Sequence, residues 1–169
     1  MKEKYKKIIS PASAVPTIID NFYGAEFSLV HRACNMVMLT FIAKNGEEYQ
    51  LHVQCHFRIT LSGKVLLDTD ALYTKSTKMQ NEENVDYDVT GNSLFDEIAD
   101  KKSDLFLGGK VKEIGYDEGD LRLVLNNGAR IDVFKNVTEY ENEVYPAYPR
   151  ENYRIFRACE DGEDPDFVV

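Results

Sequence analysis

The chain has 169 residues, a length that suits one domain whose core buries roughly 70% of the surface of the unfolded chain. Hydrophobic residues make up 43% of the sequence and aromatic residues 11%, which excludes wholesale disorder and favours a β-rich domain. The formal net charge is −9: residues 1–81 hold ten basic against seven acidic residues, and residues 82–169 hold ten against twenty-two. The acidic half disfavours nucleic acid as a partner, because phosphate would be repelled.

The sequence indicates a cytoplasmic protein without a membrane segment. No apolar run approaches the roughly 18 residues of a membrane span, and residues 1–7 are basic without the apolar core of a signal peptide. Cys34, Cys55 and Cys159 are odd in number and lack a regular spacing, which predicts reduced thiols. We expect a flexible basic arm at residues 1–10 and a single globular domain after it.

The first half of the chain predicts one short helix and then strands. In residues 11–23, apolar side chains recur at helical spacing, and Pro16 limits the segment to a short helix that Gly24 can end. Residues 27–33 alternate loosely and predict a strand. Residues 49–59 alternate between apolar and polar without a break, which predicts one continuous strand with a buried face.

Turn signals predict how the strands pair. Residues 44–46, 61–63 and 126–128 each fit a three-residue hairpin loop ending in glycine, and residues 117–120 fit a fourth turn. For residues 44–46 a two-residue turn is the alternative, but the three-residue loop keeps the apolar side chains of both strands on one face. The predicted pairs are Phe41 with Tyr49, Leu39 with Leu51, Val37 with Val53, Ile59 with Val65, Phe57 with Leu67, Leu123 with Ile131, Leu121 with Val133, Ile114 with Leu123, Tyr116 with Leu121, and on the outer face Arg122 with Asp132.

The region between the hairpins predicts a long loop and one helix. Residues 72–91 are polar and have no period, so they read as an exposed loop. Asn92 and Ser93 offer N-caps for a helix over residues 94–106, with acidic residues in its first turn. The side chains expected to face the sheet are Leu94, Phe95, Ile98 and Leu105. Residues 138–150 form an acidic connection to a short final strand.

These elements predict an α+β fold. Two antiparallel β-meanders, at residues 27–70 and 110–134, would pack as a sandwich or a partly open barrel. One helix lies between the meanders in the sequence, and a short helix precedes them.

A zinc site is the first functional hypothesis to test, because His31 precedes Cys34 by three positions and His52 stands near Cys55 and His56. Strand geometry argues against it. Residues three apart point to opposite faces, and His52 and His56 would lie about 13 Å apart at roughly 3.3 Å per residue. We therefore expect no metal and no cofactor, and we interpret Cys55 as a small core residue.

The polar face of the strand at residues 49–59 is a candidate binding face. In the predicted register His56 lies across from Asp68, and Gln54 lies across from Asp70. No serine, threonine or second carboxylate completes a catalytic set at a suitable spacing. The candidate residues are His52, Gln54, His56, Arg58, Asp68 and Asp70.

Acidic side chains of the second half form a second candidate surface, which would dock a basic protein partner. Their order matches no known calcium loop. The candidate docking residues are Asp117, Glu118, Asp120, Glu160, Asp161, Glu163 and Asp164.

Three segments carry a resemblance to a known family. They read L-H-V-Q-C-H-F-R-I at residues 51–59, N-N-G-A-R-I-D-V-F at residues 126–134, and N-Y-R-I-F-R with a later D-F-V-V from residue 152 onward. In this order they resemble small bacterial proteins that carry a Leu-His-x-Gln-Cys-Pro-Trp-Arg strand and end in a Glu-x-Trp-Arg-x-Phe segment. His56 and Phe57 stand here in place of the proline and tryptophan, and Tyr153 in place of the second tryptophan.

The resemblance implies no established activity. The matched positions are Leu51, His52, Gln54, Cys55, Arg58, Arg154 and Phe156. Two of them, Arg58 and Arg154, are candidates for partners of buried or bound carboxylates, because the guanidinium fork fits a carboxylate.

We expect a non-enzymatic, acidic binding protein of the bacterial cytosol that docks a basic protein, as an immunity protein or a nuclease inhibitor would. One alternative is a small-ligand binder or a hydrolase-type enzyme that uses His56, Asp68 and Arg58. Another is a structural subunit of a larger assembly, in which residues 167–169 would pair with another sheet edge.

Overall fold

The computed structural model describes residues 6–9, 17–135, 152–157 and 167–168. The predicted acidic connection at residues 138–150 lies outside the described residues. Inside the predicted arm, β1 (Lys6–Ile9) forms a strand. None of the described helices is long and apolar enough to cross a membrane.

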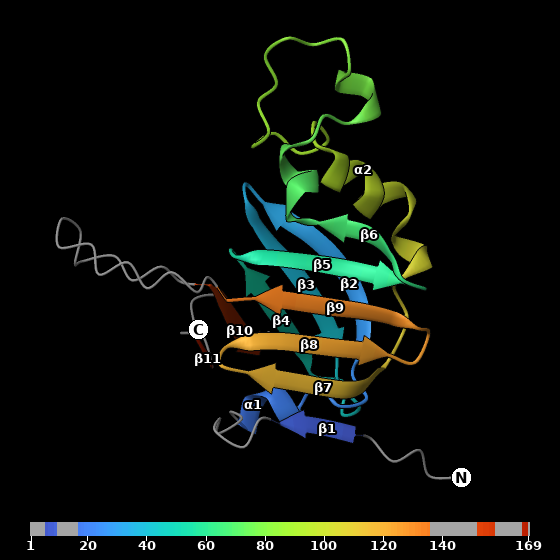
Figure 1. The fold of residues 1–169 in the computed structure, drawn as a ribbon, viewed down its shortest axis with the longest axis vertical. Helices are drawn as coiled ribbons and strands as arrows, with labels where there is room; N and C mark the ends of the chain where they lie inside the picture. The colour runs from blue at the N-terminus through green and yellow to red at the C-terminus, as the bar shows by residue number, and fades with distance from the viewer. Residues whose placement is uncertain (1–5, 10–16, 136–151, 158–166, 169) are drawn as a thin grey trace, which may run out of the picture.

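One sheet contains six strands. They are β1, β7 (Val111–Asp117), β8 (Asp120–Leu125), β9 (Ala129–Phe134), β5 (His56–Leu61) and β6 (Lys64–Asp68), in that spatial order. β1 joins β7 in parallel, and all the other neighbours are antiparallel. Figure 1 shows β5, β7, β8 and β9 side by side in one layer.

The second sheet contains five strands, all antiparallel to their neighbours. They are β11 (Phe167–Val168), β10 (Tyr153–Arg157), β4 (Glu48–Val53), β3 (Met36–Ile42) and β2 (Glu26–Ala33), in that spatial order. Residues 167–168, expected to serve the edge of another sheet, extend the chain's own sheet through β10.

The two sheets form the layers of a sandwich, and the core lies between them (Figure 1). Every second side chain of a strand points inward, so β4 buries Tyr49, Leu51 and Val53. The short helix α1 (Thr17–Asp20) leads into Phe22, whose ring meets Phe41 edge-on at 4.9 Å between centroids. The predicted α+β fold is confirmed as a sandwich that is not a closed barrel.

The predicted continuous strand at residues 49–59 is wrong, because the chain changes sheet in its middle. β4 ends at Val53 in one sheet and β5 begins at His56 in the other. The N–H groups of Gln54 and Cys55 both donate to the carbonyl oxygen of Asn152, at 2.8 and 3.1 Å. These bonds satisfy the backbone where it leaves one ladder for the other. The first predicted meander is thereby divided between the two sheets.

Most of the predicted registers are confirmed. The hairpins at residues 44–46, 117–120 and 126–128 pair as predicted. The hairpin after β5 differs, because Ile59 pairs with Leu67 and Leu61 pairs with Lys64 around a two-residue turn. Both turn residues have positive φ, as this turn type requires, and a bulge after Ile59 absorbs the change of register.

The predicted helix is confirmed in its first half and ends early. α2 (Leu94–Lys101) begins at Ser93, whose hydroxyl accepts the Asp96 N–H in a capping box. A 3-10 turn, η3 (Ser103–Leu105), follows. Phe95 and Ile98 are buried as predicted and Leu94 is partly buried, whereas Leu105 is 51% exposed and Phe106 is buried instead. The tighter turn changes which side chain faces the core.

A buried ion pair fixes the long loop, which contains the 3-10 helices η1 (Thr69–Tyr73) and η2 (Thr77–Met79). Arg32 donates from Nε and Nη2 to the two carboxylate oxygens of Asp96, both at 2.7 Å, and the two side chains are only 2% and 7% exposed. Arg32 also donates to the carbonyl oxygen of Val89. Asp96 accepts the N–H of Gly91 and the hydroxyl of Ser93. The pair therefore joins β2, the loop and α2.

We expect this pair to make stability depend on pH in the acid range. Burial alone would raise the pKa of the Asp96 carboxyl, but hydrogen bonds from Arg32, Ser93 and Gly91 outweigh burial and lower it from 3.8 to about 2. A lowered folded-state pKa stabilises the fold above the unfolded-state value, and this contribution is lost as the pH falls from about 4 to 2. The lowered pKa of Asp96 contributes about 2 kcal/mol to the free energy of unfolding above about pH 4.

Urea unfolding of the wild type and of Asp96→Asn at pH 5 and pH 2.5 measures this contribution. The stability difference between the two proteins should shrink by most of that amount at the lower pH, since the amide of the variant does not titrate in this range. A difference that stays constant between the two pH values contradicts the expectation.

Candidate functional site

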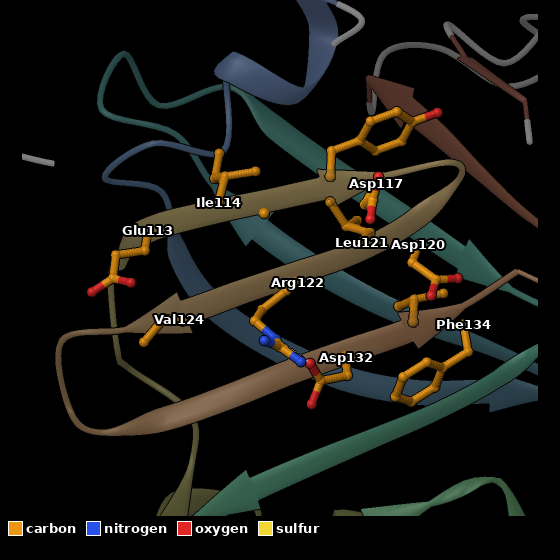
Figure 2. A pocket seen from close by; sticks show the side chains of 12 residues that line it. Glu113, Ile114, Asp117, Asp120, Leu121, Arg122, Val124, Asp132 and Phe134 are labelled. Atoms are coloured by element: carbon orange, nitrogen blue, oxygen red, sulfur yellow. Dashed lines mark hydrogen bonds and ion pairs between the residues drawn. The ribbon is translucent and has the colours of Figure 1, made fainter. Parts of the chain in front are cut away.

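The outer face of the six-stranded sheet carries one buried carboxylate surrounded by three arginines. Arg122 of β8 and Arg58 of β5 lie directly across from Asp132 of β9, one on either side. The Asp132 carboxylate accepts from Nε of Arg122 at 2.6 Å, of Arg130 at 2.9 Å and of Arg58 at 3.4 Å. We call Asp132 with these three arginines the arginine cluster; Figure 2 shows Arg122 extended toward Asp132.

The arginine cluster carries surplus positive charge. The Asp132 side chain is only 2% exposed, whereas those of Arg58, Arg122 and Arg130 are 41%, 52% and 38% exposed. A buried carboxylate is costly unless it is paired and hydrogen-bonded, and the guanidinium groups meet both conditions. Arg58 also lies over the ring of Phe134, at 5.0 Å from Cζ to the centroid, in cation–π geometry.

A hollow of about 390 Å³ opens beside the arginine cluster. Its lining includes Gly115 of β7, which lies across from Arg122 and, having no side chain, leaves the face of the sheet open there. We call it the acid-rimmed hollow. Its lining side chains include Glu113, Asp117, Asp120, Arg122, Val124 and Phe134.

The acidic rim is built by the β7–β8 turn. Asp117 and Asp120 pair across it, and both are exposed, as is Glu118 between them. Glu118 and Gly119 have φ values of 48° and 100°, the left-handed conformation that a two-residue hairpin turn requires. Asp120 accepts the backbone N–H of Lys135 at 2.7 Å, which fixes one carboxylate of the rim.

The predicted binding face does not form one surface. His52 lies in the five-stranded sheet, where its Nε2 is 3.0 Å from Gln50 Oε1, while His56 and Arg58 lie in the other sheet. Burial, helped by the charge of His31, lowers the pKa of His52. Gln54 stands at the crossing between the sheets and belongs to neither.

The predicted pairing of His56 with Asp68 is also wrong, because the two-residue turn and a bulge at Leu66 of β6 move the register. Arg58 takes the place across from Asp68, and His56 lies across from Phe134. Asp68 accepts the N–H of Ala71 at 3.2 Å and thereby caps η1. Asp70 follows in η1 and is exposed.

The acidic candidates divide into two groups. Asp117, Glu118 and Asp120 lie together in the β7–β8 turn, and Asp117 and Asp120 line the acid-rimmed hollow. The other four, Glu160, Asp161, Glu163 and Asp164, lie outside the described residues.

Sequence reasoning missed Arg130, Glu113 and the role of Asp132. The outer-face pair of Arg122 with Asp132 was predicted and is confirmed. Arg58 joins the arginine cluster because β5 pairs with β9, a strand far from it in the sequence. The available signal was the alternation of Arg130 and Asp132 on one strand face. The expectation that Arg58 contacts a buried carboxylate is confirmed.

Cys55 is a core residue, as interpreted from the sequence. It is buried, and burial raises the pKa of its thiol to about 12, whereas a nucleophilic cysteine needs a lowered pKa. Among the described residues there is no group of three or more His, Cys, Asp or Glu side chains that could hold a metal ion.

Comparison with protein-family models, with curated proteins and with solved structures gave no match. The resemblance to small bacterial proteins therefore stays a prediction.

Proposed function

We propose that this chain is a non-enzymatic binding protein that docks a basic partner protein at the acid-rimmed hollow. The observation that carries the proposal is that Glu113, Asp117 and Asp120 all line one hollow of about 390 Å³ in the outer face of the sheet. A lysine or arginine side chain of a partner would place its apolar stem over Gly115 and Val124 and its charge among the carboxylates.

The charges around the hollow support docking in two ways. The exposed carboxylates Asp117, Glu118 and Asp120 lie next to one another in a rigid turn, so they attract a basic surface before contact. Arg122, the one basic side chain among the described residues of the lining, directs its Nε to Asp132 at 2.6 Å. A partner of the kind that an immunity protein neutralises, such as a basic nuclease or toxin, fits this charge pattern.

A bacterial cytoplasmic location belongs to the same proposal. Cys34 is exposed and Cys55 is buried, and neither forms a disulfide. Unpaired thiols are typical of a reducing compartment.

Affinity capture from a native host lysate with three baits tests the proposal. The baits are the wild type, the variant Asp117→Asn/Glu118→Gln/Asp120→Asn, and a control variant Glu82→Gln/Glu83→Gln/Asp100→Asn. Both variants remove three exposed carboxylates, but only the first removes carboxylates that line the hollow, those of Asp117 and Asp120. An asparagine at position 120 keeps an oxygen for the Lys135 N–H.

We expect the wild-type and control baits to retain the same basic protein at low salt and to release it as the salt concentration rises. The turn variant should retain on the order of tenfold less of it. Equal retention by all three baits, or retention that does not depend on salt, contradicts the proposal.

A further inference from the structure

We propose that the arginine cluster is an oxyanion-binding site, which takes a carboxylate or phosphate group on the solvent side of Arg58, Arg122 and Arg130. This inference goes beyond the proposed docking function and does not rest on it. It concerns a small molecule or group that carries one oxyanion.

The charge balance of the cluster is the first argument. Three guanidinium groups contact one carboxylate, that of Asp132, so two positive charges are not balanced within the cluster. Neither Asp68 nor Asp120 accepts a hydrogen bond from the cluster, since Asp68 accepts the N–H of Ala71 and Asp120 accepts the N–H of Lys135. An incoming anion therefore meets a local excess of positive charge.

The hydrogen-bond donors of the cluster are the second argument. All three arginines hydrogen-bond to Asp132 through Nε alone, and their Nη nitrogens have no hydrogen-bond partner among the described residues. A guanidinium presents its Nη donors as a planar fork that fits a carboxylate or a phosphate. The donors are accessible, because the three side chains are 38% to 52% exposed.

The site is also held in place before any ligand arrives. Asp132 is buried on a central strand and fixes the three guanidinium groups from β5, β8 and β9. The ring of Phe134 supports Arg58 from the side. Donors that are already oriented cost less entropy on binding.

The neighbouring hollow limits the class of ligand. Arg122, Asp132 and Phe134 belong to its wall, so the rest of a molecule bound at Arg122 has room there. Glu113 and Asp117 stand elsewhere on that lining and would repel a second anionic group. The ligand class is therefore a molecule with one oxyanion and a neutral or cationic remainder.

Titration with two simple probes, acetate and inorganic phosphate, tests the site. Heteronuclear NMR of the full chain follows the Nε–H signals of the arginines at constant ionic strength, with sodium chloride as the balancing salt. Saturable shifts at Arg58, Arg122 and Arg130 are expected with at least one probe. Arg32 serves as internal control, because its guanidinium is buried against Asp96 and its signal should not move.

The probe with the lower Kd shows whether the site prefers a carboxylate or a phosphate, and either result supports the site. In Arg130→Gln the Kd for that probe should rise about tenfold, since one charged donor is lost. Arg130→Lys, which keeps the charge but not the planar guanidinium fork, should also bind the probe more weakly. This variant replaces Arg130→Gln in the test if Arg130→Gln does not fold. No saturable shift with either probe overturns the proposal, as does a Kd that is unchanged in a folded variant.

Discussion

Asp96→Asn should lower the free energy of unfolding by about 4 kcal/mol, because it leaves a buried guanidinium without its counter-charge. The Arg32 side chain is 2% exposed and donates twice to the Asp96 carboxylate. An asparagine offers one oxygen in place of two and no charge. The same carboxylate also accepts from Gly91 and Ser93, so the start of α2 and the loop before it lose a shared acceptor.

Chemical denaturation at pH 7 measures this loss. Asp100→Asn is the matched control, since Asp100 is exposed on the same helix, and it should change stability by no more than about 0.5 kcal/mol. A loss below about 1 kcal/mol in Asp96→Asn would show that the pair contributes little to the fold.

Asp132→Asn should cost about 2 kcal/mol although the residue lies on the outer face of the sheet. The substitution leaves three guanidinium groups close together without the carboxylate that neutralises one of them. The expected loss is smaller than that for Asp96, because these arginines are about half exposed and water screens their repulsion.

The salt dependence of the Asp132→Asn loss gives a second readout. Added sodium chloride screens the repulsion among the arginines and should reduce the loss. Asp117→Asn, on the same face but in the exposed turn, is the control and should be nearly neutral. A variant as stable as the wild type at low salt would refute the view that Asp132 neutralises the cluster.

Local sequence rules predicted three of the four hairpins correctly, because the register of a hairpin follows from a turn and two alternating strands. Leu39 with Leu51 and Leu123 with Ile131 were found in this way. The rules failed at Gln54, where the pattern of alternation continues although the chain changes sheet. Alternation reports which side chains face the core, and both β4 and β5 face the same core from opposite layers.

The candidate site was predictable in part for the same reason. The turn with Asp117 and Asp120 follows from the β7–β8 hairpin, and the pair of Arg122 with Asp132 follows from the β8–β9 hairpin. Arg58 joins them only through the contact of β5 with β9, which no local pattern encodes. A bulge at Leu66 of β6, equally invisible in the pattern, then brings Arg58 rather than His56 across from Asp68.

The outer face of the six-stranded sheet therefore carries two neighbouring surfaces of opposite charge. The acid-rimmed hollow has the chemistry to receive a basic side chain, and the arginine cluster has the chemistry to receive an oxyanion. Asp132 and Arg122 belong to both, since they line the hollow and form the cluster. A partner that used both surfaces would carry a basic group and an acidic group next to each other.

The affinity of the captured partner for the three baits, measured at one low ionic strength, tests the docking surface most directly. The proposed site predicts that Glu82→Gln/Glu83→Gln/Asp100→Asn binds with the Kd of the wild type. It predicts that Asp117→Asn/Glu118→Gln/Asp120→Asn binds on the order of tenfold more weakly. Equal weakening in both variants would mean that net charge alone attracts the partner, and would contradict docking at the acid-rimmed hollow.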